Sequence, residues 1–139
     1  PERARLEQLS AELGLQRAVR FLGQVDNERM PSLYSKADIA LNPSVVDNMP
    51  ISILEALASG VPVVSTNSGG IPAMVKSGEE AVLVSPRDPV AMADAVVALW
   101  EAPALRAVMR EAGLVKAKAF GWSSVREKWR GVYERVTAK

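Results

Sequence analysis

The sequence predicts an α/β fold in which a parallel sheet is flanked by helices, and two observations support this prediction. Segments with helical and extended patterns alternate along the chain with short loops between them, which favours parallel strands joined by helices. Short runs near residues 38–42, 61–65 and 81–84 are continuously apolar, as in parallel strands covered on both faces. From Pro89 onward the pattern is helical.

The elements before the first of these runs are less regular. Residues 19–22 are expected to form a strand, and residues 27–36 a helix, because Pro31 fits its first turn. Ahead of them we expect a helix that ends at Gly14 and whose leucines recur at steps of three and four: Leu6, Leu9 and Leu13.

The segment 47–55 is the most informative part of the chain. Glu55 is the only charged residue from Asn48 to Gly70, and a carboxylate in so apolar a run is costly to bury alone. Pro50 is favoured in the first turn of a helix, with Asn48 as its expected N-cap. Helical side chains lean toward the N-terminus, where free N–H groups attract anions. We therefore expect a site for a phosphate-bearing ligand with hydroxyls. The alternative is an ordinary helix start whose glutamate pairs with a lysine or arginine.

Topology selects the same part of the chain independently. Ligands of open parallel sheets bind outside the carboxyl ends of the strands. That edge is expected to collect the loops at residues 23–25, 43–47 and 67–71.

Composition describes a globular domain. The 139 residues are 48% hydrophobic with a formal net charge of +1, and the chain contains neither cysteine nor histidine. This excludes disulfides and thiolate metal sites, and we expect neither a bound metal nor a resident cofactor. Because no transmembrane or signal segment is recognisable, a cytoplasmic location is the default.

Short motifs succeed one another along nearly the whole chain: Phe21-Leu22-Gly23, Met30 to Tyr34, Ala37-Asp38, Asn42-Pro43-Ser44, Leu54 to Val64, Gly69-Gly70-Ile71-Pro72, Leu83 to Pro86 with Asp88-Pro89, and Phe120-Gly121-Trp122 with Tyr133. In this order they resemble the C-terminal, nucleotide-sugar-binding domain of GT-B glycosyltransferases of family 4. The resemblance implies a Rossmann-like parallel sheet with a helical C-terminal tail. It also implies that residues 1–139 are a single partial donor-binding domain, with the N-terminal acceptor domain absent.

The function implied by this resemblance is that of the donor-binding half of a retaining hexosyltransferase. The substrate would be a nucleoside-diphosphate sugar, most often UDP- or GDP-linked. The acceptor would be a saccharide or a lipid-linked molecule, as in polysaccharide or glycolipid synthesis. The chain's own N-terminal domain would be its partner, so the isolated chain is expected to be inactive. The alternative is a catalytically inactive sugar-nucleotide-binding or scaffold module.

The resemblance also assigns roles to residues. Family members bracket the donor with two glutamates that have seven residues between them, the second on the ribose hydroxyls and the first on the transferred sugar. Glu55 matches the second position. Asp47 occupies the first and is one methylene shorter, so the sugar preference stays open. Pro50 has no N–H for a phosphate. The expected hydrogen-bond donors to the phosphates are the Ile51 and Ser52 amides. Met49 and Ser44 are lesser candidates.

Other roles are less specific. Gly23, Gln24 and Val25 resemble the loop that holds the base, mostly through main-chain groups, so the nucleotide cannot be named. Gly69 and Gly70 are expected to serve a turn. In many family members an Arg and a Lys stabilise the leaving diphosphate, and both would lie upstream of the first helix of this sequence. The cations available here do not match that motif; they are Lys36, Lys76 and Arg87.

The last third of the chain is basic, with nine Lys or Arg and three Glu from Arg106 to Lys139. A solvated face is the first interpretation and contact with the inner membrane surface the second. Nucleic acid is the third and least favoured interpretation, and no nucleic-acid partner is expected, because the charges are spread around the helices and form no base-stacking platform. An amphipathic helix is also expected there. Its apolar stripe would be partly exposed without the N-terminal domain, and it consists of Trp122, Val125, Trp129, Tyr133 and Val136.

Overall fold

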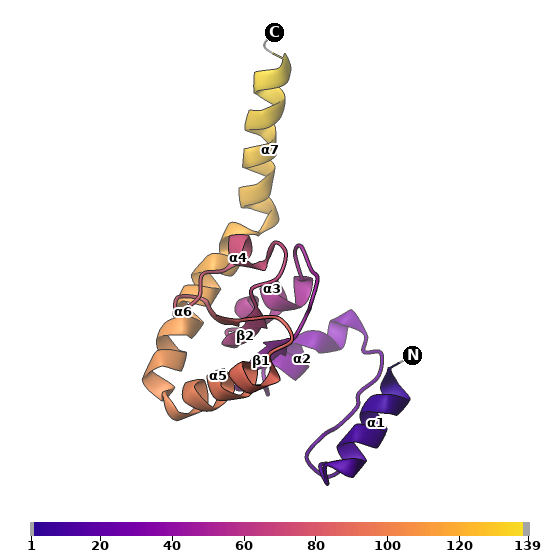
Figure 1. Ribbon diagram of the computed structural model, residues 1–139. Coiled ribbons are helices and arrows are strands. Elements are labelled where there is room, and N and C mark those ends of the chain that lie inside the picture. The colour runs from indigo at the N-terminus through magenta and orange to yellow at the C-terminus, as the bar shows by residue number, and fades with distance from the viewer. Residues whose placement is uncertain (1, 138–139) are drawn as a thin grey trace. The chain divides into compact units, whose positions relative to one another are not determined.

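The computed structural model describes residues 2–137 and divides into two compact units, residues 1–30 and 31–139. The first contains α1 (Arg3–Glu12) and the 3₁₀ helix η1 (Asn27–Arg29), and α2 (Met30–Tyr34) starts at the boundary (Figure 1). The second contains, in chain order, β1 (Ala40–Asn42), α3 (Ile51–Ala58), β2 (Val63–Thr66), α4 (Ile71–Met74), β3 (Ala81–Val84), α5 (Pro89–Glu101), α6 (Pro103–Ala119) and α7 (Trp122–Thr137).

The N-terminal helix is confirmed, but two predictions for the residues after it need correction. Gly14 has φ +69°, a left-handed conformation suited to glycine, just after α1. The strand predicted at residues 19–22 is wrong, since these residues form no ladder hydrogen bonds with another strand. The helix predicted at 27–36 is shorter than expected and begins with a 3₁₀ turn, although Pro31 does lie in the first turn of α2.

The three strands of the second unit form a parallel sheet in the order β1-β2-β3. Ala40 pairs with Val63 and Val63 with Ala81. All three strands were predicted from their apolar runs, and the α/β class is confirmed. Because the strands are parallel, the loops after β1, β2 and β3 leave the sheet at one edge.

The core lies on both faces of β2. Val63 belongs to a buried cluster with Ile53, Ala56 and Leu57 of α3, whereas its neighbour Val64 packs with Leu99 of α5 and Met109 of α6. Successive strand residues point to opposite faces, so α3 and α5 cover opposite sides of the sheet.

The central strand β2 is covered on both of its faces, but the first strand, β1, is not. All four residues of β2 are buried, whereas Leu41 of β1 is 55% exposed. This corrects the expectation that all three apolar runs are covered on both faces. Among the described residues β1 is an edge strand, and its apolar sequence does not distinguish an edge from a centre.

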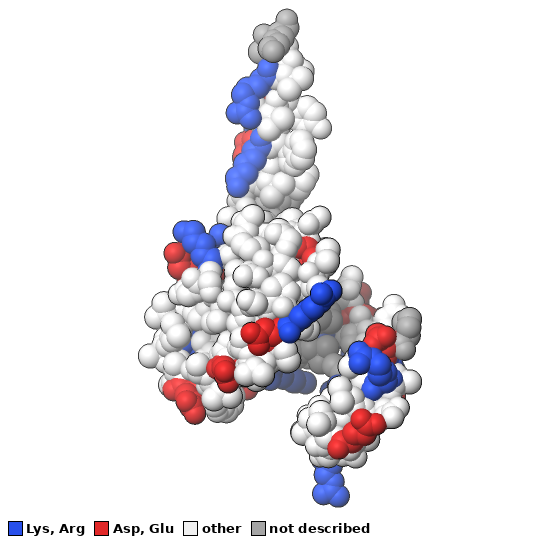
Figure 2. Space-filling view, viewed as in Figure 1, with Lys and Arg blue, Asp and Glu red and all other residues white. Residues whose placement is uncertain are grey.

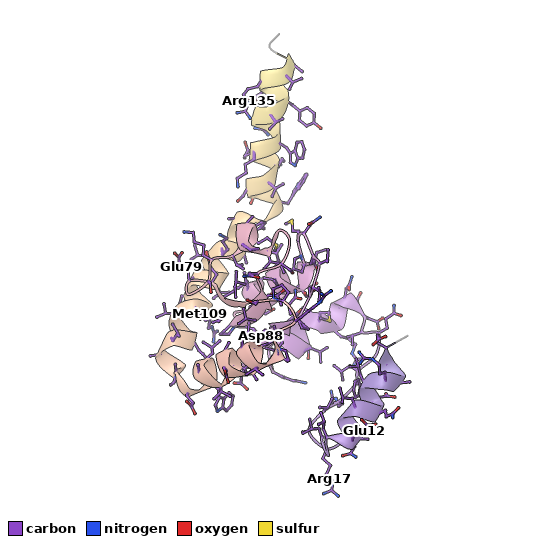
Figure 3. The ribbon with its side chains drawn as sticks, viewed as in Figure 1. Glu12, Arg17, Glu79, Asp88, Met109 and Arg135 are labelled. Carbon is purple, nitrogen blue, oxygen red and sulfur yellow. The ribbon has the colours of Figure 1, made fainter. Side chains whose placement is uncertain are left out.

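Two side chains hold the C-terminal helices in place. Asp88 caps α5 by accepting a hydrogen bond from the Ala91 N–H at 2.9 Å, and Figure 3 shows it at the start of that helix. Glu80 joins the turn before β3 to α6: it accepts from the Lys76 N–H at 2.8 Å and pairs with Lys116 Nζ at 3.4 Å.

Helix α7 carries the amphipathic stripe expected from the sequence, and most of it is exposed. Trp122 is 72% exposed, and Trp129, Tyr133 and Val136 are also exposed. Lys and Arg side chains run along one side of α7 in Figure 2, where its other visible surface is uncharged. Within residues 2–137, no helix is both long enough and apolar enough to span a membrane.

Candidate functional site

Two of the three loops predicted for the carboxyl edge of the sheet meet there, whereas residues 23–25 follow no strand of this sheet. The loop after β1 reaches the loop after β2, where the Gly70 N–H donates to the Asp47 carbonyl at 3.0 Å. The Thr66 and Ser68 hydroxyls both donate to the Ser44 carbonyl, Ser68 at 3.0 Å. These three hydrogen bonds, one from a backbone N–H and two from side-chain hydroxyls, fix the loop that carries Asp47 relative to β2.

Glycine is required where the loops touch. Gly69 has φ +54°, and a Cβ there would lie 2.0 Å from the Asp47 carbonyl oxygen. At Gly70, which has a negative φ, a Cβ would lie 2.1 Å from the Asn48 carbonyl oxygen. The turn role predicted for these glycines therefore holds, but close approach of two backbones is an additional reason for them.

Asp47 is half-buried and folds back onto its own loop. Its Oδ1 accepts a hydrogen bond from the Met49 N–H at 3.1 Å, an Asx-type turn. The Met49 amide is therefore engaged in this structure. Ser44, the other lesser candidate, donates its N–H to Asn42 Oδ1 at 3.1 Å.

Helix α3 starts with unpaired amides. Pro50, in an extended conformation with ψ 115°, is the N-cap, so the prediction of Asn48 as N-cap is wrong. Asn48 lies two residues too far upstream for that position, and α3 has no side-chain cap. The first N–H groups of a helix have no partner within it, and those of Ile51 and Ser52 have none elsewhere in residues 2–137. Both residues are exposed on the surface.

Glu55 is half-buried on α3. The alternative interpretation, an ordinary helix start, required it to pair with a lysine or arginine, and its partner is neither. Among residues 2–137 it forms no ion pair with a lysine or arginine. The Tyr34 hydroxyl instead donates to Glu55 Oε2 at 3.2 Å. Burial, the hydrogen bond to Glu55 and the negative charge of Glu55 raise the pKa of Tyr34 to about 12. The sequence placed Tyr34 in one of the motifs that resemble the family but gave it no role at the site.

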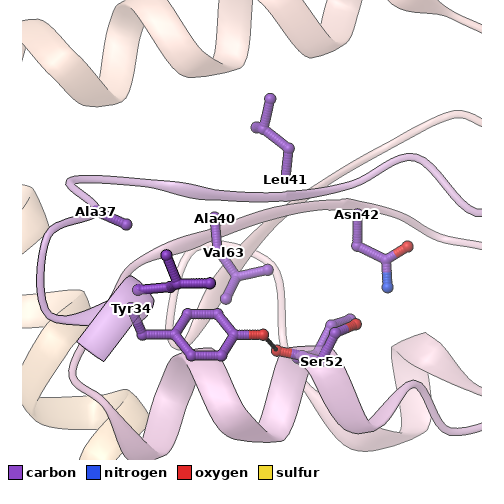
Figure 4. A pocket seen from close by; sticks show the side chains of 9 residues that line it. Tyr34, Ala37, Ala40, Leu41, Asn42, Ser52 and Val63 are labelled. Carbon is purple, nitrogen blue, oxygen red and sulfur yellow. Dashed lines mark hydrogen bonds between the residues drawn. The ribbon is translucent and has the colours of Figure 1, made fainter. Parts of the chain in front are cut away.

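A cavity of about 260 Å³ adjoins this pair between α2, β1 and α3 (Figure 4). Its walls are mostly apolar, but they include Asn42 and the phosphate-donor candidate Ser52 beside Leu33, Tyr34, Ala37, Ala40, Leu41, Ile53 and Val63. Neither Asp47 nor Glu55 lines it. Apolar walls do not suit a diphosphate, so the charged candidates and this cavity are neighbouring but separate features.

The candidates Gly23, Gln24 and Val25 belong to the first unit. Gly23 has φ +69°, and the Arg3 guanidinium would lie 3.2 Å from a Cβ at this position. Their expected role in holding a base stays a prediction. As for metal ions, within residues 2–137 no three His, Cys, Asp or Glu side chains are grouped closely enough to bind one.

At the carboxyl edge of this parallel sheet, the helix start has open amides and the nearby carboxylate has no cationic partner among the described residues. This combination is typical of nucleotide-binding α/β domains. Comparison with known proteins makes the class specific. The family described as "Glycosyl transferases group 1" matches residues 1–102, and the chain belongs to this family.

Individual relatives agree with this assignment. The D-inositol 3-phosphate glycosyltransferase of Corynebacterium urealyticum is 40% identical over 119 residues, which are 86% of this chain and 28% of that protein. Sucrose-phosphate synthase of Thermosynechococcus elongatus has a TM-score of 0.89 at 31% identity, over 99% of this chain and 35% of its own.

A third comparison supports the fold. HepE of Anabaena, solved in complex with UDP-glucose, has a TM-score of 0.83 at 23% identity over 98% of this chain and 36% of its own. The fold is that of the C-terminal domain of GT-B glycosyltransferases, as the motif order predicted. The chain spans about three tenths of the length of the curated relatives that it matches.

Proposed function

We propose that this chain binds the nucleotide-sugar donor of a retaining glycosyltransferase, which moves a hexose to a saccharide or lipid-linked acceptor. The observation that carries the proposal is the arrangement on α3. Its first turn presents the free Ile51 and Ser52 amides, and its second turn carries the half-buried Glu55, which has no cationic partner among the described residues. A nucleoside diphosphate offers an anion for the amides and a ribose diol for the carboxylate.

The roles follow from what each group can accept or donate. Backbone N–H groups at a helix start bind phosphate oxygens, so Ile51 and Ser52 take the diphosphate. A carboxylate accepts hydrogen bonds only, so Glu55 takes the ribose hydroxyls. Asp47, on the loop before α3, takes the transferred sugar, and the Gly23–Val25 loop takes the base. HepE shares the fold and was solved with UDP-glucose, which favours a UDP-linked donor here.

The complete reaction needs more than these residues. Developing charge on the leaving diphosphate requires preorganised positive groups. Of the three cations considered, Lys76 is paired with Glu79 at 3.4 Å. We propose that residues 1–139 form one donor-binding domain and that an N-terminal domain supplies the acceptor site and the remaining catalytic groups. Alone, residues 1–139 would bind donor weakly and transfer nothing.

One observation favours a second function, a sugar-nucleotide-binding module without catalysis. The start of α3 offers few donors, because Pro50 has no N–H and the Met49 N–H is engaged by Asp47. A protein of this kind would bind nucleotide through Glu55 but would not turn over a sugar nucleotide.

Titration calorimetry of the intact protein tests the donor site. Glu55→Gln keeps the size of the side chain and removes its charge, so it is expected to weaken UDP or GDP binding by about 1–3 kcal/mol, or about 5- to 150-fold. Glu111→Gln, an exposed position on α6, is the matched control and should leave binding unchanged. An unchanged nucleotide affinity in Glu55→Gln would make Glu55 a structural residue and remove the basis of the proposal.

A further inference from the structure

Tyr34 reaches Glu55 from a different element. It is the last residue of α2, and its hydroxyl lies 3.2 Å from Glu55 Oε2 and 3.3 Å from the Ser52 carbonyl oxygen. Figure 4 shows the ring lying along α3 with the hydroxyl at Ser52. A phenol has a single proton and can donate it once. Hydrogen bonds to a charged acceptor are the stronger ones, so the carboxylate is the favoured partner.

The ring of Tyr34 is held more firmly than the carboxylate that it contacts. Tyr34 packs against the buried cluster that contains Ile53 and Leu57, and the turn after it is closed by the Ala37 N–H donating to the Tyr34 carbonyl at 2.9 Å. Glu55, by contrast, is a flexible side chain without an ion-pair partner in residues 2–137. The contact therefore constrains Glu55 more than it constrains Tyr34.

We propose that Tyr34 is a positioning residue, which holds the Glu55 carboxylate through Oε2 in the orientation that receives the ribose diol. This inference rests on the proposed function, because it assumes that Glu55 binds ribose. A carboxylate has about four lone-pair sites. One hydrogen bond from Tyr34 leaves Oε1 and the second site of Oε2 for the two ribose hydroxyls.

The alternative is that Tyr34 only fills space between α2 and α3. Tyr34→Phe separates the two roles, because it keeps the ring packed against the buried cluster and removes only the hydroxyl. In titration calorimetry of the intact protein, this variant is expected to bind UDP about three- to tenfold more weakly, as for one net hydrogen bond. Its melting temperature should stay close to that of the wild type.

Two further measurements distinguish positioning from packing. UDP that lacks both ribose hydroxyls (2′,3′-dideoxy-UDP) should bind Tyr34→Phe and wild type equally. In a Glu55→Ala background, which removes the acceptor of the Tyr34 hydroxyl altogether, adding Tyr34→Phe should cost no further affinity for UDP. Equal weakening of UDP and 2′,3′-dideoxy-UDP, or additive losses in the double variant, would overturn the positioning role.

The pH dependence provides another check. Since the pKa of Tyr34 is raised from 10.0 to about 12, the hydroxyl keeps its proton throughout the neutral range. The ratio of wild-type to Tyr34→Phe affinity should therefore be the same at about pH 7 and about pH 10, where a tyrosine with the ordinary pKa would be half ionised. A ratio that fell between these two values would contradict a neutral donor.

Failure of this inference can be told from failure of the proposed function. If Glu55→Gln weakens UDP binding and Tyr34→Phe does not, the ribose role of Glu55 stands and the positioning role is lost. If Glu55→Gln leaves UDP binding unchanged, the proposed function fails and the inference fails with it.

Discussion

At the scale of single residues, the two acidic candidates have different surroundings. Glu55 is contacted from another element by the Tyr34 hydroxyl, whereas Asp47 is tied into its own loop by the Met49 N–H. A change at Asp47 therefore alters both a charge and a turn. The role of the charge on the sugar is therefore tested by a substitution that removes the charge and keeps the turn.

Asp47→Asn makes that separation. The asparagine side-chain oxygen can still accept from the Met49 N–H, so the turn is kept while the negative charge is lost. If Asp47 acts on the sugar, kcat/KM for the sugar nucleotide should fall about tenfold or more, while the UDP dissociation constant changes less than about twofold. Steady-state kinetics and UDP titration of the intact protein measure the two quantities.

Two companion variants complete this series. Asp47→Ala removes the turn as well, so it should lower kcat/KM at least as much as Asp47→Asn. Asp47→Glu restores the side-chain length usual in the resembling family and should shift the preference among donor sugars. Equal losses of UDP binding and of turnover in Asp47→Asn would contradict the division of labour between Asp47 and Glu55.

The sequence identified Glu55 but not its partner, and the reason is physical. An isolated carboxylate in an apolar run is visible in the local pattern. Tyr34, however, lies 21 residues away, and only packing of α2 against α3 brings the two together. The misassigned N-cap has a local cause, because Asn48 and Pro50 both suit a helix start and the sequence does not show which of them adopts the capping conformation.

At the scale of elements, the loops after β1 and β2 function as one structure. Gly70→Ala tests this, because a Cβ there would lie 2.1 Å from the Asn48 carbonyl oxygen and the backbone must move. We expect the free energy of unfolding to fall by about 1–3 kcal/mol, as in other overpacked sites. Turnover of the sugar nucleotide should fall as well, since the displaced segment carries Asp47. Urea denaturation and steady-state kinetics measure these effects.

Gly131→Ala is the matched control for this substitution. It lies inside α7 with open space around the added Cβ, so turnover should be nearly unchanged and the free energy of unfolding should rise by about 0.5–1 kcal/mol, as for Gly→Ala within a helix. If Gly70→Ala behaved like Gly131→Ala, the contact between the two loops would not be what holds Asp47 in place.

Local pattern predicted some elements well and others poorly. The three strands of the sheet were found because each is a continuous apolar run, and α5 to α7 because their pattern extends over many turns. The strand expected at residues 19–22 failed because a strand exists only when a neighbour completes its hydrogen bonds. Leu41 shows the same limit, since edge and central strands can have similar sequences.

At the scale of the whole molecule, the order of motifs carried the most information. Each motif occurs in many proteins, but their succession along the chain led to the family that the comparisons confirm. The chain corresponds to about three tenths of its curated relatives, and the exposed Trp122, Trp129 and Tyr133 of α7 mark a surface that residues 2–137 do not cover.

The central claim is that a nucleoside diphosphate binds at the carboxyl edge of the sheet on the start of α3. Hydrogen–deuterium exchange of the intact protein, with and without saturating UDP, tests it most directly because it reports on the backbone amides. We predict slower exchange with UDP in peptides that cover residues 44–58 and 23–25. Protection confined to the opposite edge, around the cavity lined by Gly60, Pro62 and Arg110, would contradict the claim.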